Sequence, residues 1–325
     1  WNGWWVRRIL QQGGDLYYTS LLFHPSGVSL LFHNFAWVNI ALWLLGEPLV
    51  GGITAYNLAF LVHIPLCGLS MFLLARHLTD STVAAFLGGL IYAFLPYRML
   101  HANHPNVVST EGFPLLMLFL LRLLEGKRPV RDGLVAGLLI AFIGYTRWQF
   151  LVLAAVMAGG YLAYSLVWER DRWHRRTVGG LALMVIVATA LVAPGLYPLL
   201  KTELTSGLPE EVDTANFENG KQDILTYVIP QHQHPLRPVY DHLFPTFAEA
   251  DLRNRYSAFL GHVVALLAAV GVLRRWGRDR TGFWLALGGI CLVLALGPHL
   301  WFRQIQTNIP LPYQLVGWLK PVKLL

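Results

Sequence analysis

The stretch TAYNLAFLVHIPLCGLSMFLLA, residues 54–75, contains no Asp, Glu, Lys or Arg. The hydrocarbon core of a bilayer is about 30 Å thick, and a helix needs roughly 20 apolar residues to cross it. This stretch is long enough to do so. Leu, Ala, Val and Gly dominate seven further stretches of the same kind. We therefore predict eight membrane spans, at residues 54–75, 82–97, 107–124, 133–147, 149–167, 178–200, 257–273 and 281–301.

The composition agrees with this interpretation. Hydrophobic residues make up 55% of the chain, charged residues make up 13%, and the mean hydropathy is +0.48. An average soluble domain carries roughly 25% charged residues. No series of alternating strands of about ten residues recurs, which argues against an outer-membrane barrel. We expect an all-α polytopic membrane protein, with Cys67 and Cys291 as buried free thiols inside apolar runs.

Basic residues in the short loops predict which ends of the spans face the cytoplasm. Four basic clusters follow alternate spans, so all four loops fall on one side. That side should be cytoplasmic, and the net charge of +7 then needs no nucleic-acid partner. The clusters are Arg76 with His77; Arg122, Lys127, Arg128 and Arg131; Arg170, Arg172, Arg175 and Arg176; and Arg274, Arg275, Arg278 and Arg280.

Every long polar stretch then falls on the exterior side, which places any chemistry there. The chain opens on Trp1 without an initiator Met and ends in LKPVKLL, so we interpret it as a fragment. We expect a single transmembrane domain over residues 1–325. Its parts are an exterior loop at 1–53, six spans over 54–200, an exterior loop at 201–256, two spans over 257–301 and an exterior segment at 302–325.

The first exterior loop should carry two surface helices. Residues 1–12, WNGWWVRRILQQ, are too short and too polar to span the membrane. Residues 28–46 could form a span, but His33, Asn34 and Asn39 favour a helix that lies at the membrane interface. A span here would also move residues 1–27 to the cytoplasmic side. We favour the interfacial interpretation.

Several residues of the exterior side could carry chemistry. Asp15 follows two glycines and is a candidate general base, although an Asp in this position also forms turns by accepting from its own backbone. His24 precedes a proline and is expected in extended backbone. His24 and His33 could contact a substrate hydroxyl or phosphate, and histidines at an interface are equally ordinary.

A second polar group surrounds the turn HANHPN at residues 101–106. Polar residues at a membrane boundary that face a helical bundle often mark a site, whereas a solvated loop with Asn106 or Ser109 as a helix cap is the alternative. Arg147 lies in a short turn between two spans, where it could bind a phosphate or reach toward lipid headgroups. The candidate substrate-binding residues of these two turns are Arg98, His101, His104, Asn106, Glu111 and Arg147.

The loop at 201–256 contains QHQHP at 231–235. His232 and His234 could chelate a metal, but no third ligand is placed by a motif, so we expect contact with substrate instead. The chain contains no phosphate-binding glycine-rich loop, nucleophile elbow or CxxC pair. No cofactor is indicated, and a divalent cation is compatible with the chemistry but has no motif to support it.

The order of several phrases resembles that of bacterial polytopic proteins of the C-type (GT-C) glycosyltransferase superfamily, related to the protein mannosyltransferase and aminoarabinose transferase group. The resemblance covers nearly the whole chain. The phrases are FHPSGVSLLFHN (23–34), AYNLAFLVHIPLCGLSMFLLARHLT (55–79), GGLIYAFLPYRMLHANHPNVVSTEGFPL (88–115), DILTYVIPQHQHPL (223–236), ALGPHL (295–300) and LPYQLVGWLKP (311–321).

The resemblance implies a transferase of the bacterial inner membrane that moves a hexosyl or pentosyl group from a polyprenyl-phosphate donor to an acceptor on the exterior face. In that superfamily the catalytic Asp lies early in the first exterior loop, often before a phrase like WNGWW. The resemblance therefore implies a base upstream of Trp1, with Asp15 as the nearest acid in this chain. It also implies basic roles for Lys320 and Lys323.

Two other classes of function are compatible with the sequence. A transporter or flippase of lipid-linked sugars would favour inverted repeats and helices broken at the membrane midplane. No internal repeat is visible, and the polar residues gather toward one face. A non-catalytic assembly protein would use the exterior loops to bind a partner.

Overall fold

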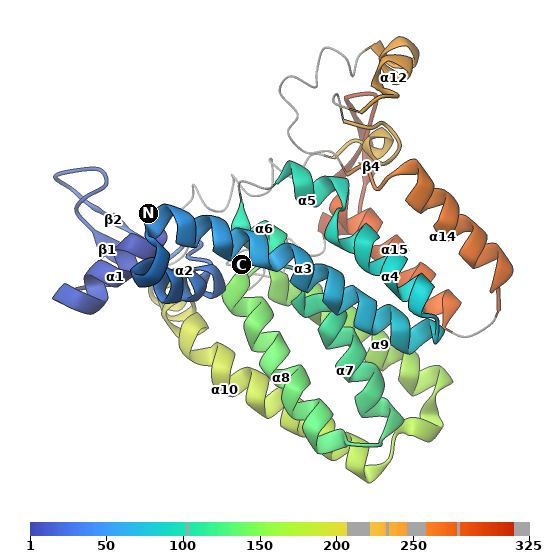
Figure 1. Cartoon of the computed structure of the whole chain (residues 1–325), viewed down its shortest axis with the longest axis horizontal. Helices are drawn as coiled ribbons and strands as arrows, with labels where there is room; N and C mark the ends of the chain where they lie inside the picture. The colour runs from blue at the N-terminus through green and yellow to red at the C-terminus, as the bar shows by residue number, and fades with distance from the viewer. Residues whose placement is uncertain (102–103, 207–221, 232–233, 246–257, 278–279, 315–325) are drawn as a thin grey trace. The chain divides into compact units, whose positions relative to one another are not determined.

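The computed structural model describes residues 1–101, 104–206, 222–231, 234–245, 258–277 and 280–314 (Figure 1). The chain divides into two compact units, which we describe separately. Unit 1 comprises residues 1–93 and 102–207, and unit 2 comprises residues 94–101 and 208–323. Among the described residues helices dominate, and six helices are long and apolar enough to cross a membrane. The chain is therefore an all-α polytopic membrane protein.

Six helices long and apolar enough to cross a membrane lie where six spans were expected, over residues 54–200. They are Gly52–Thr79, Thr82–Leu100, Pro105–Glu125, Pro129–Thr146, Phe150–Trp168 and Arg175–Thr202. The helices of unit 1 are α1 (Asn2–Gln12), α2 (Trp37–Val50), α3 (Gly52–Thr79), α4 (Thr82–Ala93), α6 (Pro105–Val108), α7 (Gly112–Glu125), α8 (Pro129–Thr146), α9 (Phe150–Trp168) and α10 (Arg175–Ser206), with the 3-10 turn η1 (Arg170–Arg172). Because α10 continues to Ser206, the polar loop expected from residue 201 starts later than predicted.

Helix α7 lies at the centre of unit 1. Its side chains Leu116, Met117, Leu120 and Leu121 are fully buried against α3 and α8. By contrast, α3, α9 and α10 leave many Leu, Ile and Val side chains exposed, as helices that face lipid do. Unit 1 is thus one bundle built around a single buried helix.

Helices α8 and α10 approach each other through glycines. A Cβ atom at Gly133 would lie 2.1 Å from the carbonyl oxygen of Gly180, and one at Gly180 would lie 2.5 Å from the carbonyl oxygen of Pro129. Small residues permit such close backbone contact between membrane helices. These glycines therefore set the distance between the two helices.

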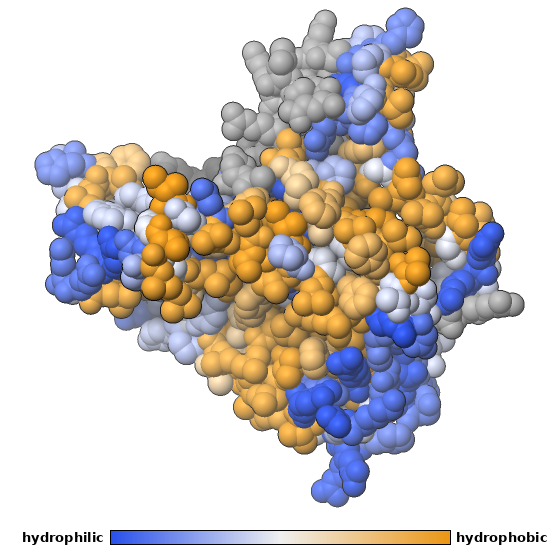
Figure 2. Space-filling view, viewed as in Figure 1, coloured by the Kyte–Doolittle hydropathy of each residue, from blue (hydrophilic) through white to orange (hydrophobic). Residues whose placement is uncertain are grey.

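Three of the predicted basic loops gather at one end of unit 1, which we call the basic end. His77, after α3, bonds with Glu125 at the end of α7, Nε2 to Oε1, at 2.9 Å. Gly126 lies against Thr177 in the first turn of α10. Figure 2 shows the hydrophilic residues collected at this end, below the apolar flank of the helices. The shared side predicted for these three loops is confirmed within unit 1.

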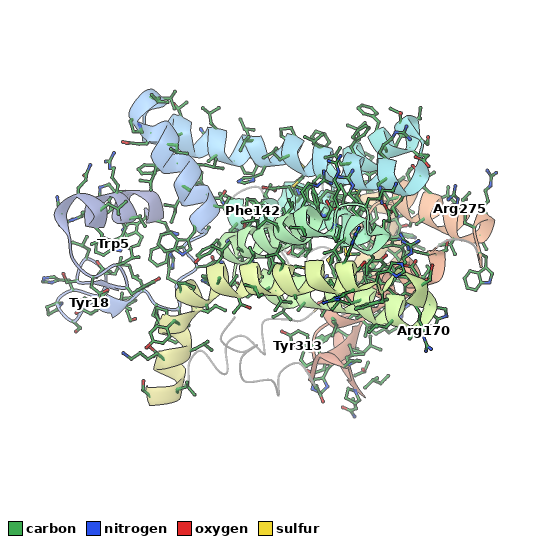
Figure 3. The ribbon with its side chains drawn as sticks, turned by 90° about the horizontal axis from the view of Figure 1, so that it is seen from below. Trp5, Tyr18, Phe142, Arg170, Arg275 and Tyr313 are labelled. Atoms are coloured by element: carbon green, nitrogen blue, oxygen red, sulfur yellow. The ribbon has the colours of Figure 1, made fainter. Side chains whose placement is uncertain are left out.

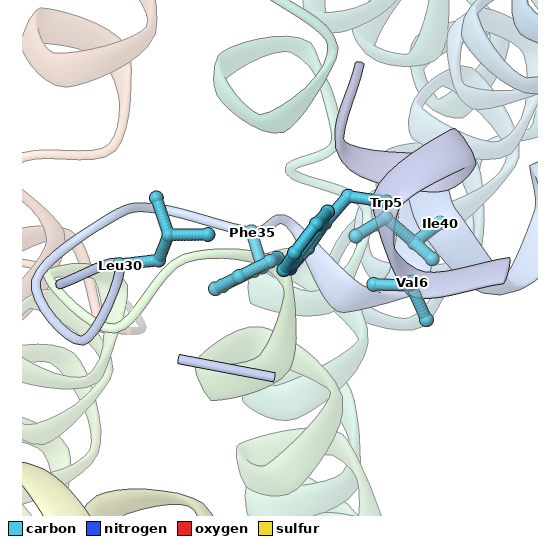
Figure 4. Packing of buried hydrophobic residues seen from close by; sticks show 5 residues of the cluster. All are labelled: Trp5, Val6, Leu30, Phe35 and Ile40. Atoms are coloured by element: carbon cyan, nitrogen blue, oxygen red, sulfur yellow. The ribbon is translucent and has the colours of Figure 1, made fainter. Parts of the chain in front are cut away.

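The opposite end of unit 1 is covered by residues 1–51, and we call it the capped end. Helix α1 occupies the expected segment 1–12. Strands β1 (Tyr18–Thr19) and β2 (Val28–Ser29) form an antiparallel hairpin, and α2 packs on α3 and α8. A small apolar core joins these pieces (Figure 4). It consists of Trp5, Val6, Leu30, Phe35 and Ile40.

The helix predicted at residues 28–46 lies later in the chain than expected. Residues 28–29 form a strand, and the helix starts only at Trp37 after Ala36 adopts a positive φ of 55°. Helix α2 contains 14 residues, fewer than the roughly 20 needed to cross a bilayer. The first segment therefore holds two short helices, as expected, but the second extends to Val50.

Unit 2 contains α5 (Pro96–Leu100), η2 (Ile224–Tyr227), α12 (Arg237–Leu243), α14 (His262–Arg274), α15 (Thr281–Ala295) and an antiparallel hairpin of β3 (His299–Phe302) with β4 (Ile305–Pro310). The two spans predicted at 257–273 and 281–301 appear as apolar helices of only 13 and 15 residues. Gly261, with φ 99°, precedes α14, and Gly297 with Pro298 follows α15. The spans were therefore predicted too long, and the hairpin was not predicted.

Candidate functional site

A set of polar side chains is buried inside unit 1, where the helix path from residue 105 to 125 is broken. Helix α6 ends at Val108 and α7 begins at Gly112, so Ser109, Thr110 and Glu111 lie outside regular helix. The side chains of Ser109 and Glu111 point inward and are 2% and 4% exposed. We call Asn39, His63, Cys67, Ser109 and Glu111 the interior polar cluster.

Hydrogen bonds connect the members of the interior polar cluster. His63 Nδ1 lies 2.7 Å from Glu111 Oε1, and His63 Nε2 lies 3.0 Å from Asn39 Oδ1. The Asn39 amide donates to Ser109 Oγ at 3.4 Å. The Cys67 thiol donates to Glu111 Oε2 at 3.4 Å. The cluster thus links α2, α3 and the break before α7.

With the Asn39 amide in this orientation, both ring nitrogens of His63 face acceptor oxygens. The donor and acceptor roles of the two nitrogens depend on the tautomer of the ring and on the orientation of the Asn39 amide. Glu111 and Asn39 therefore hold the His63 ring from both sides.

The depth of the interior polar cluster makes it unusual. Glu111 precedes α7, whose 14 residues extend about 21 Å to the basic end. A hydrocarbon core of about 30 Å therefore includes Glu111. Ionisable residues at this depth are costly and commonly mark function. The His63 and Glu111 side chains are only 1% and 5% exposed, so the cluster contacts no substrate in this conformation.

A second polar group lies at the capped end, where residues 1–51 meet the end of α8. Asp15 Oδ1 accepts from the backbone N–H of Tyr17 at 2.8 Å, which is the turn geometry that the Gly-Gly-Asp sequence also predicts. Burial raises the pKa of the Tyr17 phenol, and the nearby Tyr145 and Asp15 raise it further. Tyr17 is therefore a neutral hydrogen-bond donor beside the exposed Asp15 carboxylate.

The structure brings Asp15 and Arg147 to the same end of unit 1. Tyr145, which interacts with Tyr17, lies in the last turn of α8 and donates to the Leu191 carbonyl at 2.8 Å. Arg147 follows α8 directly, is half-buried and donates to Gln149 Oε1 at 3.1 Å. Figure 3 shows Trp5 and Tyr18 of the capped end far from Arg170 of the basic end. We call Asp15, Tyr17, Tyr145 and Arg147 the capped-end group.

Two predicted histidines of residues 1–53 have different surroundings. His24 is exposed at the tip of the β1–β2 hairpin. His33 Nε2 lies 2.9 Å from Asn2 Oδ1, and its ring meets the rings of Trp1 and Phe35 edge-on. Burial of this ring lowers the pKa of His33, although part of the side chain remains accessible. His33 therefore links α1 to the segment that follows β2.

The predicted residues of the HANHPN region are divided between the two units. His104 precedes α6 and its carbonyl accepts from the Val107 N–H, while Asn106 lies within α6. Glu111 belongs to the interior polar cluster. Arg98 and His101 belong to unit 2, where Arg98 is buried in α5 and His101 Nδ1 lies 2.9 Å from the Tyr97 carbonyl.

The predicted histidine pair at 232 and 234 is seen in part. His234 Nδ1 accepts from the Leu236 N–H at 3.2 Å, and its ring lies 5.9 Å from that of His262. His262 Nε2 lies 2.7 Å from the Tyr240 hydroxyl. Within the part of the chain that the structure describes, no three His, Cys, Asp or Glu residues are grouped to hold a metal ion. His232, Lys320 and Lys323 lie outside the described residues.

The sequence prediction missed four members of the interior polar cluster, Asn39, His63, Cys67 and Ser109. A usable signal was present in the first predicted span. His63, Cys67 and Ser70 follow at intervals of four and three residues, which places them on one face of a helix. All three are almost fully buried, with exposures of 1%, 0% and 2%. A polar face within a lipid-spanning helix indicates packing against other polar groups.

The fold and the buried polar groups define a polytopic membrane protein with ionisable residues inside its bundle. The chain belongs to the family described as a domain of unknown function (DUF6311), whose model matches residues 2–323. Comparison with curated proteins and with solved structures gave no match.

Proposed function

We propose that the protein is a GT-C-type glycosyltransferase that moves a sugar from a polyprenyl-phosphate donor to an acceptor at the exterior face of the bacterial inner membrane. One observation carries the proposal. Two helices too short to span, α1 and α2, cover the end of the bundle opposite the basic loops. By the positive-inside rule the basic end is cytoplasmic and the capped end is exterior. This arrangement is the one that the resemblance implies.

The capped-end group has suitable chemistry for transfer. The acceptor hydroxyl or amine attacks the anomeric carbon while an Asp15 carboxylate oxygen takes its proton. The bond between the anomeric carbon and the phosphate oxygen breaks, and the phosphate leaves with the electron pair. Arg147 neutralises the charge that develops on that phosphate. Tyr17, which stays neutral, can donate a hydrogen bond to a substrate oxygen.

The test is transfer of radiolabelled sugar from polyprenyl-phosphate hexoses by full-length protein in proteoliposomes. Asp15→Asn preserves an oxygen that can accept from the Tyr17 N–H, so it changes the base and retains the turn. We expect a loss of about 100-fold or more, the usual contribution of a general base. Asp80→Asn, at the exposed end of α3, is the matched control. Equal rates in Asp15→Asn and the control would refute the role of Asp15.

A second function is supported by the interior polar cluster. Transporters bind their substrates beside broken helices near the membrane midplane, and they carry ionisable residues there. The break between α6 and α7 next to the His63–Glu111 pair has both features. Movement of intact lipid-linked sugar across the vesicle membrane, without a covalent product, would favour transport over transfer.

A further inference from the structure

Helices α8 and α10 both begin at the basic end, and their first turns lie side by side. A Cβ at Gly180 of α10 would lie 2.5 Å from the carbonyl oxygen of Pro129, the first residue of α8. A Cβ at Gly126, in the α7–α8 turn, would lie 3.7 Å from Thr177 Oγ1 in the first turn of α10. The α7–α8 turn therefore borders the start of α10. Exposed cations gather at this corner, and we call them the basic patch: Lys127, Arg128, Arg175 and Arg176.

The acids around the basic patch do not neutralise it. Within the part of the chain that the structure describes, the four cations of the patch form no ion pair. Helix α10 has no acidic residue in its first turn, although acids usually balance the partial positive charge of a helix N-terminus. The exposed Asp171, in η1, is a single carboxylate and leaves the patch positive. Three other acids pair with residues outside the patch: Glu125 with His77, Asp132 with Arg131 and Glu169 with Arg172.

Two donors beside the basic patch lack an acceptor. Thr177 is fully buried, and its hydroxyl has no hydrogen-bond partner among the described residues. The Arg172 side chain is 31% exposed, and its buried Nη1 is also without an acceptor there. Buried donors normally have partners, and an unsatisfied one is costly. An anion at the start of α10 would bring acceptor oxygens to this corner.

We propose that the basic patch binds the phosphate headgroup of an anionic phospholipid. The span Pro129–Thr146 begins directly after Arg128, and the span Arg175–Thr202 begins within the patch. The patch therefore lies at the level where spans leave the hydrocarbon core and lipid headgroups begin. Basic sites between membrane helices bind the headgroups of anionic lipids in this way. This inference depends on the membrane spans and not on the proposed sugar transfer.

Apolar side chains beside the cations favour a phospholipid over a free phosphate. Val130 follows Arg128 by two residues and is 67% exposed. Val178 follows Arg176 by two residues and is 49% exposed. Figure 2 shows that the hydrophilic basic end adjoins the apolar flank of the helices. A free phosphate needs only the cations, whereas a phospholipid also needs an apolar surface for its acyl chains, and this corner provides both.

The experiment measures lipid binding by native mass spectrometry of the full-length protein in detergent. Phosphatidylglycerol, phosphatidylcholine and inorganic phosphate are titrated separately. The variant Arg128→Gln/Arg176→Gln removes two charges from the basic patch, and Arg128→Lys/Arg176→Lys keeps them. The matched control Arg8→Gln/Lys201→Gln removes two charges from α1 and from the far end of α10. Circular dichroism confirms that each variant is folded, and the lipid preference of the wild type tests the proposal without any substitution.

We expect the wild type to bind phosphatidylglycerol more tightly than phosphatidylcholine. The Gln variant should lose about 25-fold in affinity for phosphatidylglycerol, because each Lys or Arg beside an anionic lipid surface contributes a factor of about five. The Lys variant and the control should keep the affinity of the wild type.

Three results would overturn the proposal. Equal affinity of the wild type for the two lipids would show that the headgroup charge is not recognised. Equal losses in the Gln variant and the control would show that the effect comes from net charge and not from the basic patch. Inorganic phosphate that binds and displaces phosphatidylglycerol would identify a site for a free anion. Because no enzyme activity is measured, the outcome is separate from that of the proposed function.

Discussion

Removing one partner of the buried His63–Glu111 pair should be costly. The two side chains lie 2.7 Å apart and are 1% and 5% exposed. At this distance, with an effective dielectric constant of about 20, two unit charges attract by about 6 kcal/mol. Desolvation offsets much of this attraction, but a single partner left behind has lost its compensation. We expect Glu111→Leu and His63→Leu each to lower the free energy of unfolding by about 3–5 kcal/mol.

The double variant should be less damaging than the two single changes suggest. With both charges gone, Asn39 keeps Ser109 as a partner and Cys67 keeps the Val108 carbonyl at 3.5 Å. Replacing a whole buried pair by apolar residues is often close to neutral. The assay is reversible unfolding in mixed micelles of dodecylmaltoside and SDS, followed by circular dichroism.

The basic end offers a matched control for this measurement. His77 and Glu125 form a second His–Glu pair at 2.9 Å, but their side chains are 20% and 27% exposed. Partly exposed pairs contribute about 0–1 kcal/mol, so Glu125→Leu should have a small effect. If Glu111→Leu costs no more than Glu125→Leu, or if the two cluster variants add without coupling, the His63–Glu111 pair is not a buried ion pair.

Three further predictions concern packing, pH and orientation. Gly133→Ala should destabilise the protein by about 1–3 kcal/mol, because the added Cβ meets the Gly180 backbone. Gly179→Ala, whose Cβ would have no atom within 4 Å, should leave the stability unchanged. Unfolding in mixed micelles measures both variants, and equal effects would contradict the close packing of α8 on α10. Burial lowers the pKa of His33 in the folded state. The neutral His33 ring therefore contributes to the stability of the folded state above the unfolded pKa of about 6.5, and this contribution is lost as the pH falls through the lower folded pKa. The hydrogen-exchange protection factors of α1, which are corrected for the intrinsic exchange rate at each pH, should therefore fall more in the wild type than in His33→Gln when the pH is lowered from 7.5 to 5. An identical profile would contradict this. A membrane-impermeant maleimide added outside intact cells should label Gln12→Cys and spare Arg170→Cys, and the reverse pattern would invert the proposed orientation.

Hydropathy and charge were sufficient to predict much of unit 1. The six spans over 54–200 depend on long apolar runs, and the common end of three basic loops depends on charged residues beside them. Helix α1 was also recognisable, because WNGWWVRRILQQ is apolar on one face and polar on the other. These features depend on local composition, which a sequence displays directly.

Features that depend on contacts between distant residues were not predictable in the same way. Glu111 was selected as a flanking residue of a polar turn, but its partners His63 and Cys67 lie 48 and 44 positions earlier in the chain. At the break between α6 and α7, Ser109 bonds with Asn39 and Glu111 bonds with His63 inside the bundle. In unit 2, Gly261 and Gly297 shorten two apolar runs that hydropathy alone extends.

The measurement that tests the proposed transfer most directly is a side-resolved assay in oriented proteoliposomes. Labelled polyprenyl-phosphate hexose and a panel of hydroxyl and amine acceptors are supplied, and the product is separated on each side of the membrane. We predict a covalent sugar–acceptor product that forms only on the side of the capped end and depends on Asp15. Product on the side of the basic end, or labelled donor that crosses the membrane without a new covalent bond, would contradict it.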